Sequence, residues 1–373
     1  MTISAKRVDV LPEGVIPIAL TLRERVEQEE ELDTWEEDAS KPQGGMLWVL
    51  LPAFLLLLCL VWRYARAGTA QWKNRSIRQG AVWAILGLAA VLRVVIAITV
   101  EGYRVEITCY QAWSQRMAQT GPGGFYAEDY FCDYPPGYLY VLWINGLLMR
   151  LWNMTAMTPS MLLLLKFVPM VADLCTAYIL YQDARKPLQE GPALGLALLY
   201  LCNPAVLTTG AAWGQIDAVL TLGLLLTLRY AVRGDWLRAF PSFFLSVLCK
   251  PQALMLAPIG LVALAADLWR RRKEKGAWIG ASMGLGIGVF VSLILLIPFT
   301  AQKGFGWVIG QYANTLSSYP YASINAANLF YLLGGNWVEM TQRLGMLSYA
   351  QWGTIFIVLT VVYCAVTYVL SKR

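Results

Sequence analysis

Long apolar segments alternate with short polar ones along this chain, and this alternation is the strongest constraint on its fold. The apolar segments approach about 20 residues, the length at which a helix crosses the hydrocarbon core of a bilayer. They occupy 46–62, 80–100, 137–152, 160–181, 192–209, 218–232, 240–269, 277–298 and 353–370, and a shorter piece, 326–333, is either a further crossing or a surface helix. The composition agrees, with 57% hydrophobic and only 14% charged residues. Because lipid offers no hydrogen bonds to an exposed backbone, we predict an all-α fold, a polytopic transmembrane helical bundle of about 9–10 spans.

Two clusters of Lys and Arg orient the predicted bundle. They lie in the short loops 63–78 and 270–275, and short basic loops favour the cytoplasmic side of a membrane. The polar loops 101–136 and 299–325 are then expected to face the opposite compartment together. The net charge of +6 therefore reflects membrane orientation, and we expect a lipid bilayer and no nucleic acid as a partner.

The chain divides into three parts by composition. Residues 1–45 are hydrophilic and contain an acidic run at 27–38, which is typical of a disordered tail. Residues 46–78 are expected to form an anchor helix followed by a basic cytoplasmic loop, and residues 79–373 a transmembrane domain.

The absence of histidine narrows the available chemistry, since the sequence has none. A Ser-His-Asp triad and a histidine-based zinc site are excluded, as is the commonest general base. Any reaction must use carboxylates, Lys, Arg, Tyr or a metal ion held by carboxylates.

The polar loop after the segment 80–100 is the first candidate for a site. It contains five carboxylates and ends in the turn-forming stretch Asp133-Tyr134-Pro135-Pro136-Gly137-Tyr138; the carboxylates are Glu101, Glu106, Glu128, Asp129 and Asp133. Such a loop can form a roof over a site at the membrane surface, where a carboxylate does acid–base work on a lipid-linked substrate. The alternative is an ordinary solvated connecting loop.

Ionisable residues inside the apolar segments are the second candidate. They are Arg93, Lys166, Asp173, Asp217 and Lys250. Charges at membrane depth are costly, so they pair with one another or face a polar cavity, and they often mark function. Lys166 and Asp173 are seven residues apart on one helix face, so an internal ion pair between them is the alternative to a functional role. Cations beside a carboxylate-rich loop suit an anionic, phosphate-bearing lipid.

The topology of residues 137–250 stays open at this point. If every apolar segment crosses once, residues 213–217 fall on the cytoplasmic side. Arg185 and Lys186 then fall outside, against the positive-inside tendency. Prolines at 169 and 251 interrupt two of the segments, and broken helices are tolerated in membranes where they line a cavity.

An ordered set of motifs resembles the GT-C membrane glycosyltransferases, and within them bacterial proteins related to the GPI-anchor enzyme that adds the second mannose. The motifs are Glu106…Trp113…Gly124-Phe125-Tyr126…Asp133-Tyr134-Pro135-Pro136-Gly137-Tyr138, Lys166…Pro169…Asp173, Asn203-Pro204, Trp213-Gly214-Gln215-Ile216-Asp217, Lys250-Pro251-Gln252…Pro258 and Tyr319-Pro320-Tyr321-Ala322-Ser323…Asn325-Ala326…Asn328-Leu329. The resemblance covers most of the chain after the amino-terminal anchor, and a long first outer loop is part of it.

The resemblance implies a multi-pass enzyme of the bacterial cell membrane, mannosyltransferase-like, with a polyprenyl-phosphate-sugar donor. The sugar would pass, with inversion, to a glycan, lipid or protein acceptor at the outer face. The catalytic acidic residue of the family maps to Glu106, where relatives mostly carry Asp. Relatives commonly continue with more helices, so the chain, which ends at residue 373, is expected to be a short or truncated member.

From the motifs and the charges together we select the site residues. The catalytic candidates are the carboxylates Glu106, Asp133 and Asp217. The substrate-binding candidates are Arg93, Trp113, Tyr134, Lys166, Asp173, Trp213, Gln215, Lys250, Gln252, Tyr319, Asn325 and Asn328. A carboxylate serves as base towards the acceptor hydroxyl and a cation neutralises the leaving phosphate. Two carboxylates could instead hold a divalent metal; no cofactor is certain, and whether a metal is used stays open.

Two other functions compete with this interpretation. A transporter or flippase for an anionic or lipid-linked sugar would also use broken helices and intramembrane charges. A non-catalytic GT-C relative acting as a scaffold is the other alternative, given the Glu at position 106. Transport in vesicles without a donor sugar would favour the first, and sugar transfer by the purified protein would exclude both.

Overall fold

The structure is a computed structural model that describes residues 51–52, 54–59, 63, 79–126, 130, 132–317, 320–324, 326 and 328–371. The predicted tail 1–45 and most of the anchor region 46–78 lie outside these residues. The helices are α3 (Gln79–Thr99), α4 (Arg104–Gly124), α5 (Pro136–Leu151), α6 (Pro159–Leu188), α7 (Glu190–Leu201), α8 (Pro204–Val206), the π-helix η1 (Leu207–Trp213), α9 (Asp217–Val232), α10 (Trp236–Cys249), the 3-10 helix η2 (Pro251–Leu256), α11 (Ala257–Arg270), α12 (Lys275–Leu296), the 3-10 helix η3 (Ile297–Thr300), α13 (Gly304–Ser317), α14 (Leu329–Leu332) and α15 (Tyr349–Ser371). One short antiparallel hairpin, β1 (Arg343–Leu344) with β2 (Leu347–Ser348), precedes α15.

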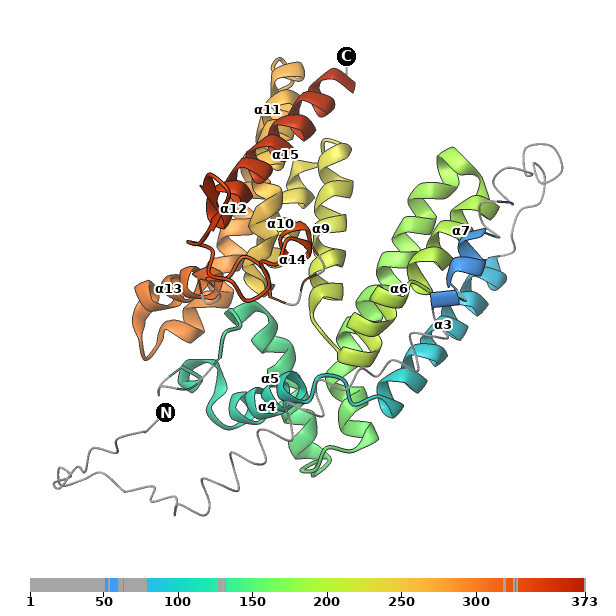
Figure 1. The fold of residues 1–373 in the computed structure, drawn as a ribbon, viewed down its shortest axis with the longest axis vertical. Helices are drawn as coiled ribbons and strands as arrows, with labels where there is room; N and C mark the ends of the chain where they lie inside the picture. Colours follow the sequence, from blue (N-terminus) through green and yellow to red (C-terminus); the bar gives the residue numbers. More distant parts are fainter. Residues whose placement is uncertain are drawn as a thin grey trace. The chain divides into compact units, whose positions relative to one another are not determined.

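Long apolar helices dominate the described residues, so the coarse prediction of an all-α, multi-pass membrane bundle is confirmed (Figure 1). Five helical stretches in these residues are long and apolar enough to cross a membrane, namely Gln79–Thr99, Pro159–Leu188, Pro251–Arg270, Lys275–Thr300 and Tyr349–Tyr368. A sixth would be the pair Glu190–Leu201 and Pro204–Trp213, which is bent by 47°. The described residues therefore contain fewer full-length spans than the nine to ten expected from roughly 20 apolar residues each.

Helix breaks account for part of this difference. The expected single span 240–269 is two helices, α10 and η2–α11, because Pro251 removes a backbone donor directly after Lys250. Residues 192–209 form the bent pair, interrupted at Asn203, which caps α8 by accepting from the Ala205 backbone. Helices α9 and α10 are apolar but shorter than a full span.

The expected span 137–152 is shorter than a full-length crossing in the structure. It forms α5, a helix of 16 residues that packs along the polar helix α4. Gly146 allows this approach, since a Cβ there would collide with the Ser114 backbone. Because α5 buries Leu139 and Leu142 against protein, its apolar residues are explained by packing as well as by a crossing.

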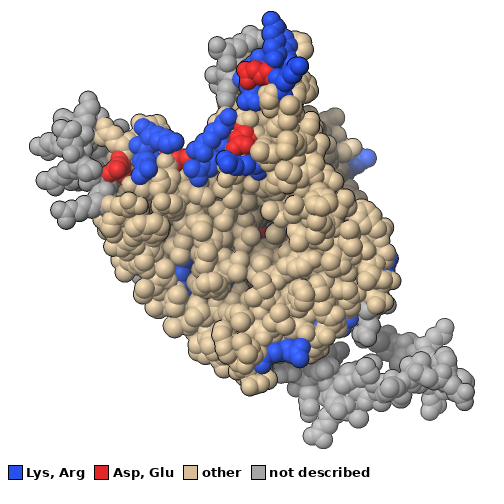
Figure 2. Space-filling view, turned by 180° about the vertical axis from the view of Figure 1, so that it is seen from behind, with Lys and Arg blue, Asp and Glu red and all other residues tan. Residues whose placement is uncertain are grey.

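Basic side chains gather at one end of the bundle, and we call it the basic end (Figure 2). Asp183 near the end of α6 pairs with Arg229 at 3.2 Å and Arg233 at 2.6 Å, at the end of α9. Arg271, just after α11, donates to the Gly234 carbonyl at 3.5 Å. The carboxyl-terminal ends of α6, α9 and α11 therefore lie together.

The opposite end, which we call the pocket end, holds the loop region before α5. Gln215, just before α9, contacts Glu106 of α4, and Lys250, just after α10, contacts Asp217. Residues 213–217 therefore lie beside loop 101–136, which removes the conflict found by simple counting. If α5 packs on α4 and does not cross the membrane, the number of crossings before α6 changes by one. Arg185 and Lys186 at the end of α6 then fall at the basic end, as the positive-inside tendency requires.

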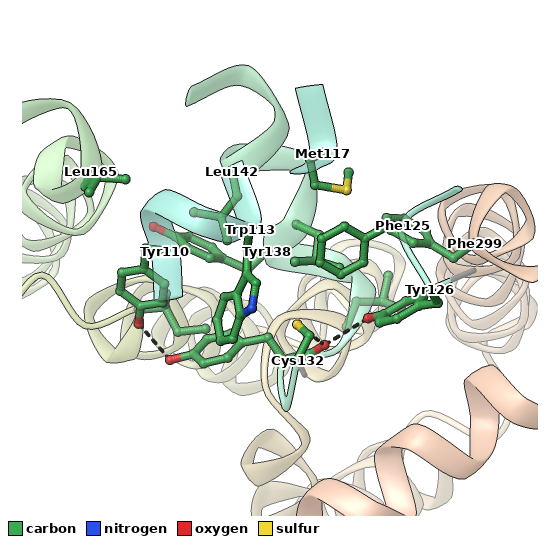
Figure 3. Packing of buried hydrophobic residues seen from close by; sticks show 14 of the residues in the cluster. Tyr110, Trp113, Met117, Phe125, Tyr126, Cys132, Tyr138, Leu142, Leu165 and Phe299 are labelled. Carbon is green, nitrogen blue, oxygen red and sulfur yellow. Dashed lines mark hydrogen bonds between the residues drawn. The ribbon is translucent and has the colours of Figure 1, made fainter. Parts of the chain in front are cut away.

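A buried aromatic cluster joins α4, α5 and the hinge between them (Figure 3). Tyr110, Trp113 and Tyr138 pack around Tyr134 with ring centroids 5.3–6.5 Å apart. Such pairs contribute about 0.5–1.5 kcal/mol each beyond their burial. The cluster fixes the hinge, and with it one wall of the site described next.

Candidate functional site

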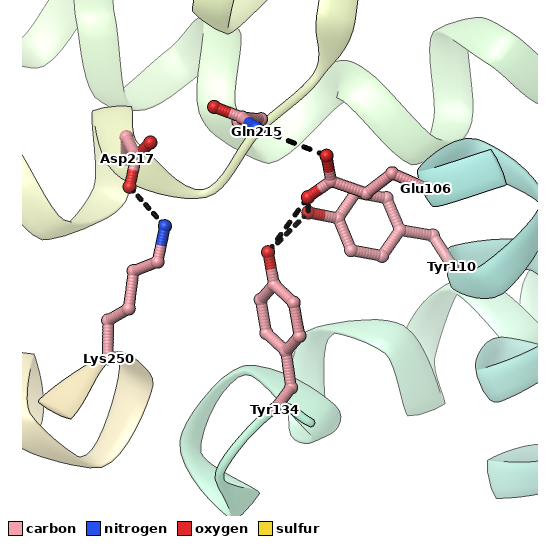
Figure 4. Close-up of polar contacts among 6 residues, drawn as sticks. All are labelled: Glu106, Tyr110, Tyr134, Gln215, Asp217 and Lys250. Carbon is pink, nitrogen blue, oxygen red and sulfur yellow. Dashed lines mark hydrogen bonds and ion pairs between the residues drawn. The ribbon is translucent and has the colours of Figure 1, made fainter. Parts of the chain in front are cut away.

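Three oxygen atoms form a triangle at the start of α4 (Figure 4). Glu106 lies in the first turn of this helix, where the helix dipole favours a carboxylate. Tyr110, one helical turn later, donates to Glu106 Oε1 at 2.6 Å, and Tyr134 from the hinge lies 3.0 Å from the same atom. The two tyrosine hydroxyls are 2.7 Å from each other.

The proton count of this triangle matters for its chemistry. Each tyrosine hydroxyl has one proton to donate, so an ionised Glu106 leaves two protons for three oxygen–oxygen contacts. A proton added to the carboxyl allows all three contacts to be hydrogen bonds, because each of the three oxygen atoms can then donate to one neighbour and accept from the other. Burial raises the pKa of Tyr110 and of Tyr134 far above the ordinary value, so both hydroxyls stay protonated. The cluster can therefore accept a proton at Glu106 without any new partner.

The second carboxylate oxygen of Glu106 is held by a different part of the chain. Gln215 Nε2 donates to Glu106 Oε2 at 3.1 Å. Gly214, with φ of 82°, turns the chain between η1 and this glutamine. A Cβ at Gly214 would meet Lys166 Cγ at 2.6 Å, so the turn requires glycine for its backbone conformation and for its close contact.

Lys250 and Asp217 form an ion pair across the site from Glu106, with 2.5 Å between Lys250 Nζ and Asp217 Oδ1 (Figure 4). Lys250 has an extended backbone between α10 and η2, and Asp217 begins α9. Their side chains are 20% and 41% exposed, so solvent or a ligand can reach the pair. Gly137 brings the hinge against the end of α10, because a Cβ there would overlap the Leu248 backbone.

A cavity of about 430 Å³ lies between these groups. It is lined by Tyr103, Val105, Glu106, Cys109, Trp113, Asp133, Tyr134, Pro135, Gln215, Lys250, Pro251 and Gln252. Seven predicted site residues are among them: Glu106, Trp113, Asp133, Tyr134, Gln215, Lys250 and Gln252. Asp217 joins the site through Lys250, and Trp213 packs edge-on against the lining residue Tyr103 at 5.6 Å between ring centroids.

Asp133 adds a second carboxylate to the cavity wall. Burial raises its pKa above the ordinary 3.8, and the charge of Glu106 raises it further. The opposing influences, a backbone hydrogen bond and the charge of Lys250, do not cancel this rise. Burial also raises the pKa of the Cys109 thiol in the same wall, so it is a protonated thiol at neutral pH.

Three predicted substrate-binding residues do not line this cavity, and their side chains have partners inside the bundle. Arg93 and Asp173 form a buried ion pair at 3.6 Å, with 0% and 2% of their side chains exposed. Lys166, also fully buried, donates to the carbonyls of Ala97, Val100 and Ala212 at 3.3, 2.5 and 2.7 Å. The alternative of an ion pair between Lys166 and Asp173 is therefore wrong in its partners, because Asp173 pairs with Arg93, and these side chains hold helices together.

The remaining predicted residues are not part of the described site. Asn328 caps α14 by accepting from the Tyr331 backbone at 2.9 Å. Tyr319 and Asn325 lie outside the described residues. In the part of the chain that the structure describes, no group of three or more Asp, Glu or Cys side chains could hold a metal ion.

Tyr110 is the contact that sequence reasoning missed. Its position four residues after Glu106 places both side chains on one helix face, which was a usable signal once α4 was recognised as a helix. Cys109 and Tyr103, which also line the cavity, carry no comparable signal.

Comparison with known proteins adds no relative: no protein family, curated protein or solved structure matches the chain.

Proposed function

We propose that the protein is a membrane glycosyltransferase that moves a sugar, mannose in the simplest case, from a polyprenyl-phosphate donor to an acceptor hydroxyl. The observation that carries the proposal is the pairing, in one cavity, of a carboxylate that can accept a proton and a lysine that can bind a phosphate. The order of the sequence motifs supports the same reaction class.

Glu106 acts as the general base in this proposal. As the acceptor oxygen attacks the anomeric carbon, its proton passes to Glu106, and the triangle with Tyr110 and Tyr134 holds that proton. The new carbon–oxygen bond forms on the face opposite to the bond that breaks, so the anomeric centre inverts. The electron pair of the broken bond leaves with the lipid phosphate. A positioned base of this kind contributes roughly 10²–10⁴-fold.

Lys250 receives the donor phosphate. Its ammonium already pairs with one carboxylate, Asp217, at the rim of the cavity. The donor phosphate would be a second anion beside the same ammonium, which stabilises the negative charge that develops on the phosphate as it leaves. Gln252 beside it offers an amide donor. Trp113 and Tyr103 line the same cavity and supply aromatic surface for a sugar ring.

The basic end supports an assignment of the side of the membrane on which the reaction takes place. Short basic loops favour the cytoplasm, so the pocket end faces outward. We accordingly assign the transfer to the outer face of a bacterial cell membrane.

A transporter would use the same intramembrane charges differently. The structure gives those charges internal partners, since Arg93 pairs with Asp173 and Lys166 with three carbonyls. These three charges therefore support packing, and the cavity with Glu106 and Lys250 is the observation that favours transfer.

The test is sugar transfer in proteoliposomes from polyprenyl-phosphate [³H]mannose, with a membrane lipid and glycan extract as acceptor. Glu106→Gln keeps the size of the side chain but removes the base, so transfer should fall by roughly two orders of magnitude. Lys250→Met should raise KM for the donor, because it removes the phosphate-binding cation. Glu106→Asp tests whether the shorter carboxylate still reaches the acceptor.

Glu101→Gln is the matched control. Glu101 is a neighbouring carboxylate that pairs with Arg104, and it does not line the cavity. Full turnover in Glu106→Gln, together with loss in Asp133→Asn, would move the base to Asp133. Full turnover in both would end the glycosyltransferase proposal, and uptake of free sugar without transfer would favour a transporter.

A further inference from the structure

A second cavity, separate from the proposed active site, lies among the helices near the basic end. It has a volume of about 320 Å³ between α9, α10, α11 and α12, and Tyr368 of α15 closes one side. We call it the apolar groove. Its wall includes Leu228, Phe240, Phe243, Leu264 and Leu285.

The wall offers almost no hydrogen-bonding capacity. Thr227 uses its hydroxyl to donate to the Gly223 carbonyl at 2.9 Å. Trp236 donates its indole N–H to Asp267 at 2.9 Å. An occupant of this groove must therefore be apolar over most of its length.

The groove lies in the half of the bundle near the basic end. Its lining comes from the last turns of α9, the first turns of α10, the first half of α11, Leu285 of α12 and Tyr368 near the end of α15. The α9 and α10 turns are close to the Arg233 and Arg271 contacts that define the basic end. From Leu264 in the wall, α11 continues for about 9 Å to Arg270. The groove thus begins among the apolar turns of α11 and lies about one to two helical turns from the basic residues that follow this helix.

Basic side chains without carboxylate partners lie at or just after the end of α11, at the basic end. Among the described residues, no carboxylate lies within ion-pair distance of Arg270, Lys273 or Lys275, while Asp267 and Glu274 are engaged by Arg271. Arg270 is exposed, and both Arg270 and Asp267 lie close enough to Tyr368, a wall residue, to act on it electrostatically. An anion placed here would meet uncompensated positive charge.

We propose that the apolar groove binds an acyl chain of an anionic phospholipid, with the lipid phosphate at Arg270. Apolar walls at membrane depth and unpaired cations at the adjacent surface match the two parts of that molecule, and basic pockets between membrane helices select anionic headgroups. A second copy of the chain would bring another basic end against this one, and like charges disfavour that arrangement. The inference does not depend on the proposed transferase activity.

Two glycines provide a clean test of the groove. Gly260 lines it, and a Cβ there would meet nothing within 4 Å, so Gly260→Phe fills the groove without a backbone clash. Gly280, on α12, is equally open but does not line the groove, which makes Gly280→Phe the matched control.

The measurement is the thermal unfolding of detergent-purified protein with added lipid, supported by native mass spectrometry. Phosphatidylglycerol should raise Tm by several degrees, about what a ligand at 100 times its Kd gives through mass action. Phosphatidylcholine with the same acyl chains should raise it much less. Gly260→Phe should abolish the phosphatidylglycerol shift and the bound-lipid peak, and Gly280→Phe should keep both.

Arg270→Gln tests the headgroup contact, with Arg185→Gln on α6 as the control at the same end. Arg270→Gln should remove the preference for phosphatidylglycerol over phosphatidylcholine, and Arg185→Gln should preserve it. An undiminished shift in Gly260→Phe overturns the groove as the site. Equal stabilisation by the two lipids overturns the anionic selection, and a dimer peak lost only in Gly260→Phe would assign the groove to a second copy.

Discussion

Two lysines that interrupt apolar stretches, Lys166 and Lys250, have opposite environments. Lys166 is fully buried and bound by three backbone carbonyls, whereas Lys250 lines a cavity and pairs with a half-exposed carboxylate. The first joins the ends of α3 and η1 to α6, and the second is available to a ligand. A charge in an apolar segment is therefore a sign of either tertiary support or chemistry, and its partners decide which.

The largest expected effect comes from breaking the buried ion pair. Asp173→Asn leaves the Arg93 guanidinium, which is 0% exposed, without its counter-charge. Loss of one partner of a buried pair destabilises by about 3–5 kcal/mol. Chemical unfolding of the purified protein in mixed micelles should show this loss.

Asp217→Asn is the comparison from the cavity. Its pair with Lys250 is partly exposed, and such pairs contribute only about 0–1 kcal/mol. Equal losses of stability in Asp173→Asn and Asp217→Asn would contradict the difference between the buried ion pair and the partly exposed ion pair at the cavity.

A smaller effect is expected for Lys166→Met, which leaves the Ala97, Val100 and Ala212 carbonyls without their donor. Unsatisfied buried groups cost roughly 1–3 kcal/mol. Because Lys166 packs on Gly214 beside Gln215, transfer should fall along with the unfolding midpoint. Lys250→Met should instead weaken donor binding and leave the unfolding midpoint nearly unchanged. A lowered midpoint in Lys250→Met with weaker donor binding only in Lys166→Met would mean that Lys250 is the structural lysine and Lys166 the ligand-binding one.

The smallest effect is a pH dependence from Asp133. Its pKa in the folded protein lies above the ordinary 3.8, chiefly because of burial, so the folded state binds this proton more tightly than the unfolded state. Its contribution to stability is therefore greatest below the ordinary value and decreases as pH rises through the folded pKa. Asp133→Asn should flatten that part of the curve of Tm against pH, and an unchanged slope would mean that Asp133 does not titrate in this way.

Sequence patterns predicted the helical membrane class and most of the cavity wall, for identifiable reasons. Apolar length sets the class, and the motifs around Glu106, Gln215 and Lys250 place polar groups at helix ends that meet. Whether the segment 137–152 crosses the membrane does not follow from its sequence, because apolar composition is the same whether a helix faces lipid or packs on α4. The sequence offered Lys166 as an alternative partner for Asp173 and not Arg93, because Arg93 lies on another helix and helix periodicity shows only neighbours on the same helix.

The buried contacts of α6 also constrain the order in which the chain can enter a membrane. This helix carries Lys166 and Asp173, and in isolation in lipid both charges would be costly. Ribosomes make α3 before α6, so Arg93 is already present when Asp173 arrives, whereas the Ala212 carbonyl in η1 is made only afterwards. Nascent α6 is therefore expected to stay beside α3 in the translocation machinery and to enter the bilayer with it as a pair, with Lys166 receiving its last ligand once η1 has been synthesised.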